Sequence, residues 1–204
     1  MATTHVATLD GQRVSLDENL IDSFQRPFHG QLITPPDPDY DDARRVWNGM
    51  LDKHPALIAR CTGTADVVAA VNFARENNLF LAVRGGGHNV AGNAVCDNGM
   101  VIDLSPMKGI HVDPARRTAR VQPGATWRDL DHETQLHGLM TPGGQMSLTG
   151  VAGFTLAGGM GYTRRKWGLA LDNLRSVEIV TANGQVITAS EAEHADLFWA
   201  ARGG

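Results

Sequence analysis

The sequence predicts an α+β protein made of two small α/β units. In the first part of the chain, stretches with helical spacing of apolar residues alternate with short apolar runs. After about residue 105, short runs joined by tight turns predict a mainly antiparallel sheet. Glycine accounts for 23 of the 204 residues and is concentrated between Gly85 and Gly168, whereas its usual share is about 7%. That segment therefore needs backbone without side chains.

The first unit is expected to begin near Tyr40. Residues 1–39 are expected to form an N-terminal arm, irregular or with one short helix, because the segment is mostly polar and ends in a proline cluster. A helix should begin at its cap, Thr64, and end near Asn77. Apolar runs at 79–83 and 100–104 predict strands. Between the arm and Thr64, a helix is predicted whose buried face consists of Ala43, Val46, Trp47, Met50 and Leu51.

The larger unit, from about residue 106, is expected to contain two hairpins and two helices. The first hairpin covers 109–113 and 118–121, and Thr126 has the spacing of a helix capping box with Asp129. The segment 141–168 contains too many glycines for a continuous helix or strand. Asn183-Gly184 predicts the turn of the second hairpin, and Ser190 is expected to open the last helix. No closing element follows, so we expect a part of a longer protein.

Bulk composition argues against several function classes. The formal net charge of −4 gives no general attraction for nucleic acid, and the one basic run, 164–166, is short. The N-terminus lacks the features of a signal peptide, and no apolar run approaches the roughly 18 residues of a membrane span. Cys61 and Cys96 have no metal-binding spacing, so we expect two reduced thiols. The expected protein is cytoplasmic, without nucleic-acid or membrane partners.

The clearest candidate site directly follows a predicted strand, at Arg84-Gly85-Gly86-Gly87-His88-Asn89. Backbone N–H groups can converge there on an anion, and Arg84 can add positive charge. A flexible hairpin loop is the alternative, because glycine runs often serve turns. The dinucleotide and P-loop glycine patterns are both absent, which argues against those folds. His88 can serve as a base, a ligand or a nucleophile, or it can be structural.

A second glycine-rich loop, at 142–153, also offers bare backbone to a large flat ligand, or it forms a bend between packed strands. Ser147 lacks the G-x-S-x-G context of a serine hydrolase. His132 and His137 resemble a zinc-binding pair with one residue too many between them. On a helix, residues i and i+5 are separated by roughly 140°, so the two rings cannot share a metal, and none is expected.

Six motifs occur in order along the chain: VRGGGHN at 83–89, DLS at 103–105, QPGATWRDL at 122–130, TGVAGFTLAGGMG at 149–161, GLALDNL at 168–174 and VTANG at 180–184. Together they resemble the FAD-binding domain of the p-cresol methylhydroxylase/vanillyl-alcohol oxidase (PCMH) superfamily. The most similar branch is the berberine bridge enzyme-like FAD-linked oxidases. The resemblance covers about residues 40–204, and a series of six motifs is far more specific than either glycine loop alone.

This resemblance implies two α/β subdomains, about 40–105 and 106–204, with FAD between them. His88 is implied to bond through a ring nitrogen to the 8α-methyl carbon of the flavin. Met146 aligns with a cysteine that makes a second link in many relatives, so we expect a single covalent bond. The implied FAD-binding residues are Arg84, Gly85, Gly86, Gly87, His88 and Asn89 around the pyrophosphate, and Leu148, Thr149, Gly150 and Gly153 as a second backbone wall.

The implied function is the FAD-binding portion of an oxidoreductase that moves a hydride from a carbon, such as one bearing a hydroxyl group, to flavin. Thr149 aligns with the position associated with oxygen access, where a small aliphatic residue is more usual, so the acceptor is left open between oxygen and another molecule. The substrate domain and the catalytic base are expected beyond Gly204, and this part alone should be inactive. The alternatives are a domain that binds FAD without turnover, and a nucleotide- or carboxylate-binding module without flavin.

Overall fold

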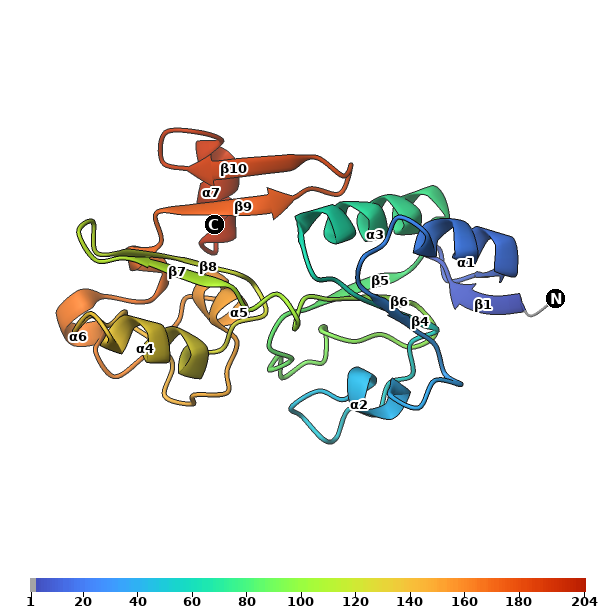
Figure 1. Cartoon of the computed structure of the whole chain (residues 1–204), viewed down its shortest axis with the longest axis horizontal. Coiled ribbons are helices and arrows are strands. Elements are labelled where there is room, and N and C mark those ends of the chain that lie inside the picture. The colour runs from blue at the N-terminus through green and yellow to red at the C-terminus, as the bar shows by residue number, and fades with distance from the viewer. Residues whose placement is uncertain (1–2) are drawn as a thin grey trace. The chain divides into compact units, whose positions relative to one another are not determined.

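Two units, each mixing helices and strands, make up residues 3–204, the part of the chain described by the computed structural model (Figure 1). The first contains residues 3–106 together with 180–186, and the second contains residues 107–179 and 187–204. The α+β class predicted from the sequence is confirmed.

A four-stranded sheet forms the centre of the first unit, with the strand order β3-β4-β6-β5. Its last three strands are parallel, whereas β3 runs antiparallel to β4. All four residues of β6 are buried, as expected for a parallel strand that is covered on both faces. The strands are β3 (Gln31–Ile33), β4 (Leu57–Arg60), β5 (Leu81–Arg84) and β6 (Met100–Asp103).

Each face of this sheet is covered by a different part of the chain. Helix α3 (Thr64–Glu76) contacts β6, and its N-cap residue is Gly63, one residue before the predicted cap Thr64. The other face belongs to a core cluster in which strand residues such as Ile58 and Val101 pack with Tyr40, Val46 and Val95. The sheet therefore has a continuous apolar interior on the side where the 40–54 segment lies.

The helix predicted to continue to Leu51 ends at Arg44, so α2 is only Tyr40–Arg44. From Arg45 the backbone is extended, with φ −67° and ψ 132°. Val46 is buried, but Trp47 and Met50 are 60% and 91% exposed, so the predicted apolar face does not exist. The prediction was wrong because polar groups of this segment bond to the loop at 84–98 instead of to carbonyls one helical turn earlier.

The residues before Tyr40 contain more regular structure than the arm, irregular or with one short helix, that we expected. Strands β1 (Thr3–Ala7) and β2 (Arg13–Asp17) form a hairpin, followed by α1 (Glu18–Gln25) and then by β3. Val6 and Leu16 are fully buried. Few apolar side chains suffice to anchor the hairpin, and they are scattered among polar neighbours, which hid the pattern in the sequence.

The second unit is organised around one hairpin and one helix, both predicted. Strands β7 (Ile110–Asp113) and β8 (Thr118–Val121) pair antiparallel. Helix α4 (Trp127–Gln135) begins at the predicted capping box, where the Asp129 carboxylate accepts from the backbone N–H and the hydroxyl of Thr126, both at 2.9 Å. The core of this unit consists of Trp127, Leu130, Val151 and Ala170.

The remaining elements are short. The glycine-rich segment contains α5 (Val151–Leu156) and α6 (Arg164–Trp167), and η1 (Leu171–Asn173) follows. Strands β9 (Ser176–Val180) and β10 (Val186–Ser190) pair through the predicted turn. The final helix is α7 (Ala195–Ala201), and its N-cap residue is His194, not the predicted Ser190. The Ser190 hydroxyl instead accepts from the N–H groups of Ala192 and Glu193 in the turn before the helix.

The turn of this last hairpin clusters with the first unit. Residues 180–186 belong there although the strands on either side belong to the second. Gly184 has φ +80°, and a Cβ atom on it would lie 2.2 Å from the side-chain oxygen of Asn72 in α3. Only glycine fits at this position. None of the helices in the described range has the length and apolar character needed to cross a membrane.

Candidate functional site

A row of charged residues lines the carboxyl ends of the three parallel strands. Arg60, Asp103 and Arg84 are the last residues of β4, β6 and β5, and the strand register places them next to one another. Asp103 Oδ2 lies 3.4 Å from Arg60 Nε, and Asp103 Oδ1 lies 3.9 Å from Arg84 Nε. The carboxyl edge of an open parallel sheet is where ligands usually bind in α/β proteins. The row therefore lies at the expected place for a binding site.

Asp103 also fixes the turn that follows β6. The Ser105 N–H donates to Asp103 Oδ1 and the Ser105 hydroxyl to Asp103 Oδ2, both at 3.0 Å. Its side chain is only 2% exposed. A buried carboxylate without compensating partners is unfavourable by several kcal/mol. The Asp103 carboxylate is compensated by two guanidinium groups and by the turn at Ser105.

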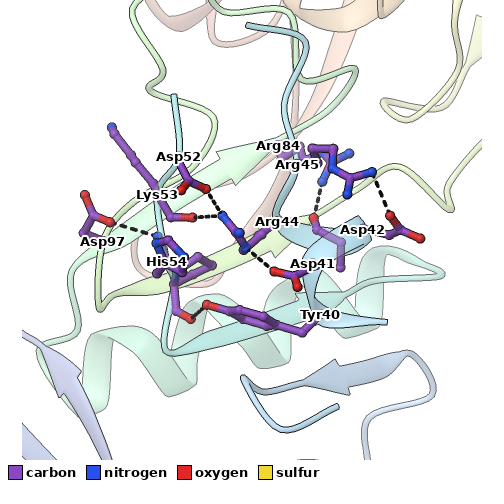
Figure 2. A network of polar contacts seen from close by, with 12 residues as sticks. Tyr40, Asp41, Asp42, Arg44, Arg45, Asp52, Lys53, His54, Arg84 and Asp97 are labelled. Atoms are coloured by element: carbon purple, nitrogen blue, oxygen red, sulfur yellow. Dashed lines mark hydrogen bonds and ion pairs between the residues drawn. The ribbon is translucent and has the colours of Figure 1, made fainter. Parts of the chain in front are cut away.

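Arg84 joins this row to the glycine loop. Its Nη1 donates to the carbonyl oxygen of Ala43, on the neighbouring 40–54 segment (Figure 2). Its Nε is buried and makes no hydrogen bond within residues 3–204. A buried donor of this kind needs an acceptor. An anionic ligand group placed on the loop would provide one.

Within the loop, Gly87 is the position where the backbone demands glycine. Its φ is +70°, and a Cβ atom there would lie 3.4 Å from Arg84 Nε. Another residue would be strained by this positive φ, although its Cβ atom would make only an ordinary contact with the guanidinium group. Gly85 and Gly86 are half-buried, and Asn89 is exposed. The Asn89 side chain accepts from the Asn93 N–H at 3.0 Å, which shapes the turn after the loop.

His88 is half-buried, and its imidazole stacks on the indole of Trp47. The ring centroids are 4.7 Å apart and the planes differ by 15°. Sequence reasoning missed Trp47 as a neighbour of His88, because the helical spacing of the apolar residues around Trp47 placed it on the buried face of a helix. It also missed Arg60, although a usable signal existed: each of the three parallel apolar runs ends in a charged residue.

The second predicted set of residues lies in the other unit, on the loop that leads into α5. The N–H of Trp127 donates to the Thr149 carbonyl at 3.0 Å, and the N–H of Val151 donates to the Ala125 carbonyl at 2.9 Å. These backbone bonds tie the loop to the start of α4. The residues of this set are Leu148, which is 45% exposed, Thr149, Gly150, which caps α5, and Gly153.

Gly153 faces open space. A Cβ atom built on it would meet no atom within 4 Å. By contrast, Cβ atoms on Gly143 and Gly144 would lie 2.7 and 3.1 Å from the ring of Trp127. Glycine at 143 and 144 is therefore explained by close packing, whereas glycine at 153 is not. A bare backbone at Gly153 leaves room for a ligand to approach.

The cysteines and histidines provide no competing site in the described part of the chain. Cys61 and Cys96 are both free and buried, and burial raises the pKa of Cys61 to about 12 and that of Cys96 to about 11. Neither thiol is ionised at neutral pH. Among residues 3–204, no group of three His, Cys, Asp or Glu side chains is arranged to hold a metal.

Comparison with known proteins gives a family for this arrangement. Residues 55–190 match a family model described as an FAD binding domain. The curated protein (R)-6-hydroxynicotine oxidase of Paenarthrobacter nicotinovorans is 41% identical over 176 residues, which are 86% of this chain and 38% of that protein. The chain spans about 40% of the length of the relatives that it matches.

Two solved structures agree with this match. Wild-type BBE-like 1 of Physcomitrella patens has a TM-score of 0.86 and 30% identity, with 91% of this chain and 40% of that chain covered. Glucooligosaccharide oxidase of Acremonium strictum has a TM-score of 0.83 and 28% identity, with 91% and 39% covered. The latter is described as carrying a 6-S-cysteinyl, 8α-N1-histidyl FAD.

Proposed function

The chain belongs to the FAD binding domain family of FAD-linked oxidoreductases, and on that premise we propose which of its residues hold the cofactor. The loop Arg84 to Asn89 binds the pyrophosphate, with Arg84 and backbone N–H groups facing the phosphates. Leu148, Thr149, Gly150 and Gly153 present bare backbone to the flavin part of the molecule.

The observation that carries this proposal is the charged row beside the glycine loop. Arg84 Nε is a buried donor with no hydrogen-bond partner among the described residues, and it lies at the carboxyl edge of parallel strands. Gly87 has a backbone conformation that keeps side chains out of the loop. These features fit a ligand with two phosphate groups lying against the backbone.

We further propose that His88 carries the flavin covalently, through a ring nitrogen bonded to the 8α carbon. Forming this link breaks one C–H and one N–H bond and makes one C–N bond. The two electrons and two protons released would pass through the flavin to an acceptor such as dioxygen, which would become hydrogen peroxide. Met146 takes the place of the second linking residue, and both cysteines are buried, so one link is expected.

For the whole protein, we propose hydride transfer from a carbon of a small-molecule substrate, such as a carbon bearing a hydroxyl group, with reoxidation by oxygen or another acceptor. When bound, FAD supplies the two-electron acceptor. The residues described here hold the cofactor in one orientation, so that a donor C–H bond positioned by the rest of the protein can approach it. The cytoplasm is the proposed location, on the basis of the sequence composition.

Acid precipitation of the full-length protein tests the proposal. Flavin absorbance should remain in the pellet of the wild type and of His132→Ala, a control in which the replaced histidine is 78% exposed. His88→Ala should release its flavin to the supernatant. Release from the wild type would contradict the covalent link. Protein that shows no flavin absorbance even after incubation with FAD would contradict the assignment of the cofactor itself.

A further inference from the structure

We propose that Trp47 is a positioning residue that orients the His88 imidazole for bonding to the flavin, an inference that rests on the proposed function of His88. The two rings are stacked, with centroids 4.7 Å apart and planes within 15°. An indole stacked on an imidazole restricts rotation about both side-chain torsions of the histidine. A fixed ring plane directs one nitrogen at a fixed point, and that orientation is what bond formation with the cofactor requires.

Trp47 can fix a neighbour because its own backbone is tied to the glycine loop. The Trp47 N–H donates to the Gly87 carbonyl at 3.0 Å, directly beside His88. On one side of this bond, Arg84 Nη1 donates to the carbonyl of Ala43. On the other side, the Asn48 side chain donates to the Val90 carbonyl at 3.2 Å. The ring pair is therefore flanked by hydrogen bonds in both directions along the chain.

Further bonds extend this connection beyond the ring pair. Lys53 Nζ donates to the carbonyls of Gly92 and Val95, at 3.0 and 3.2 Å. The His54 N–H donates to the Asp97 carboxylate at 2.8 Å, as Figure 2 shows. The segment 43–54 has little regular secondary structure after Arg44, yet it is joined to the loop 84–98 along most of its length.

Arg44 makes the same segment rigid from within. Its Nε donates to the Asp41 carboxylate at 2.8 Å, its Nη1 donates to the Asp52 carboxylate, and the same Nη1 reaches the Lys53 carbonyl at 3.2 Å (Figure 2). One guanidinium group thus bridges the two ends of the stretch that carries Trp47. The hydrogen bonds of Arg44 therefore tie together the backbone on both sides of Trp47, where no helix is present.

Burial among residues 3–204 does not explain the presence of tryptophan at position 47. The side chain is 60% exposed, whereas a large aromatic residue contributes to stability mainly by being buried. The contact with His88 accounts for an aromatic ring at this place. Replacing Trp47 should therefore impair attachment of the flavin far more than folding.

The experiment compares aromatic and aliphatic replacements in the full-length protein, produced without flavin and then supplied with FAD. The rate at which acid-stable flavin forms is measured for the wild type, Trp47→Phe, Trp47→Leu and Trp47→Met. The matched control is Trp199→Leu, which replaces a tryptophan that is 66% exposed in the other unit. We expect attachment to slow about five- to tenfold in the leucine and methionine variants, the effect of losing one aromatic pair. Phenylalanine should restore most of the rate, and the control should match the wild type.

A second measurement separates positioning from direct contact with the flavin. In a His88→Ala background, noncovalent FAD affinity is measured with and without Trp47→Leu. Affinities that agree within about twofold show that Trp47 acts through His88 and that the variant is folded. A markedly weaker affinity in the double variant overturns the inference, and so does an unchanged rate of attachment in both aliphatic variants. A wild type that forms no acid-stable flavin refutes the proposed role of His88 itself, a result distinct from the other two.

Discussion

The two glycine loops are held by different kinds of interaction. Beside one backbone bond, from the Trp47 N–H to the Gly87 carbonyl, the loop at 84–89 is held by side chains: the guanidinium group of Arg84 bonds to the neighbouring segment, Asp103 lies beside it, and Trp47 stacks on His88. The loop at 148–153 is held by backbone hydrogen bonds to the start of α4 and by packing near Trp127. A glycine backbone has too much conformational freedom to fix its own shape. Its surroundings must do so, and each unit does it differently.

This comparison predicts where each loop is vulnerable. Removing a charge should damage the first loop, because a buried ionic group would lose its partner. Removing the ring of Trp127 should damage the second, because a cavity would open beside Val151 and beneath Gly143 and Gly144, which precede the loop.

The largest effect is expected for Trp127→Ala in the second unit. Trp127 is 2% exposed, and its ring meets that of Phe154 edge-on at a centroid distance of 5.3 Å. The free energy of unfolding should fall by about 3–5 kcal/mol, the usual loss for a buried tryptophan, as measured by urea unfolding. Trp167→Ala, at a ring that is 46% exposed, should lose far less. Similar losses in the two variants would show that packing does not hold this loop.

Asp103→Ala tests the first loop. The substitution leaves Arg60 and Arg84 without their shared carboxylate, and breaking a buried ion pair in this way lowers the free energy of unfolding by about 3 kcal/mol. Urea unfolding provides the measurement. The control is Asp42→Ala, which removes a carboxylate whose side chain is 84% exposed in a pair with Arg45 and should change stability by less than about 1 kcal/mol. Equal effects at the two positions would contradict a structural role for the charged row.

Two glycine substitutions distinguish stability from cofactor binding. Gly87→Ala forces a side chain into a backbone with φ +70°, which should reduce stability by about 1–2 kcal/mol. Gly153→Ala adds a methyl group in open space within α5 and should stabilise the protein by up to about 1 kcal/mol. Both should weaken FAD binding in a fluorescence titration. If Gly153→Ala binds FAD as tightly as the wild type, the assignment of Gly153 to the FAD-binding backbone is wrong.

The smallest effect concerns pH and the capping box of α4. Partial burial opposes ionisation of Asp129, but hydrogen bonds from the Thr126 N–H and hydroxyl outweigh it, and the pKa of Asp129 lies below 3.8 in the folded state. Because the pKa is lowered on folding, the ionised group stabilises the protein above its unfolded pKa, and this contribution disappears as the pH falls through the folded pKa. Asp129→Asn should therefore be about 1 kcal/mol less stable at pH 7, with the difference shrinking as the pH falls below 3.8.

A neighbouring carboxylate supplies the control for this prediction. Burial raises the pKa of Asp131, in the same helix, so its ionised form is disfavoured by folding. Asp131→Asn should cause no loss at pH 7. Urea unfolding across the acid range measures both variants, and a loss in Asp129→Asn that is the same at all pH values would show that charge is not involved.

In both units, the elements that depend on local signals could be predicted from the sequence. The turn at Asn183-Gly184 and the capping box at Thr126 each depend on residues within a few positions of one another, and both were confirmed. The strand before the glycine loop was predicted for the same reason. The segment around Trp47 was predicted wrongly because its partners lie some forty residues away in the sequence. Helical spacing alone gives no information about such distant hydrogen bonds.

The candidate site was predicted unevenly for the same reason. Arg84 to Asn89 form a contiguous motif, so the resemblance identified them together, whereas Arg60 is brought to Asp103 only by strand pairing. The ring contact between Trp47 and His88 depends on the exact path of an irregular segment. Sequence patterns describe faces of helices and strands, and they do not describe where an irregular backbone runs.

The hairpin turn at residues 180–186 has a consequence for how the chain is made. It completes the first unit, where Gly184 lies against Asn72, although the sheet of that unit ends at Asp103. On a ribosome, the N-terminal strands emerge several seconds before this turn at usual rates of synthesis. Until the turn emerges, the nascent first unit lacks the contact that Gly184 makes with Asn72 of α3. A chain cut after Pro106 would lack that turn permanently, so the boundary between the units is a poor place to divide the gene for separate expression.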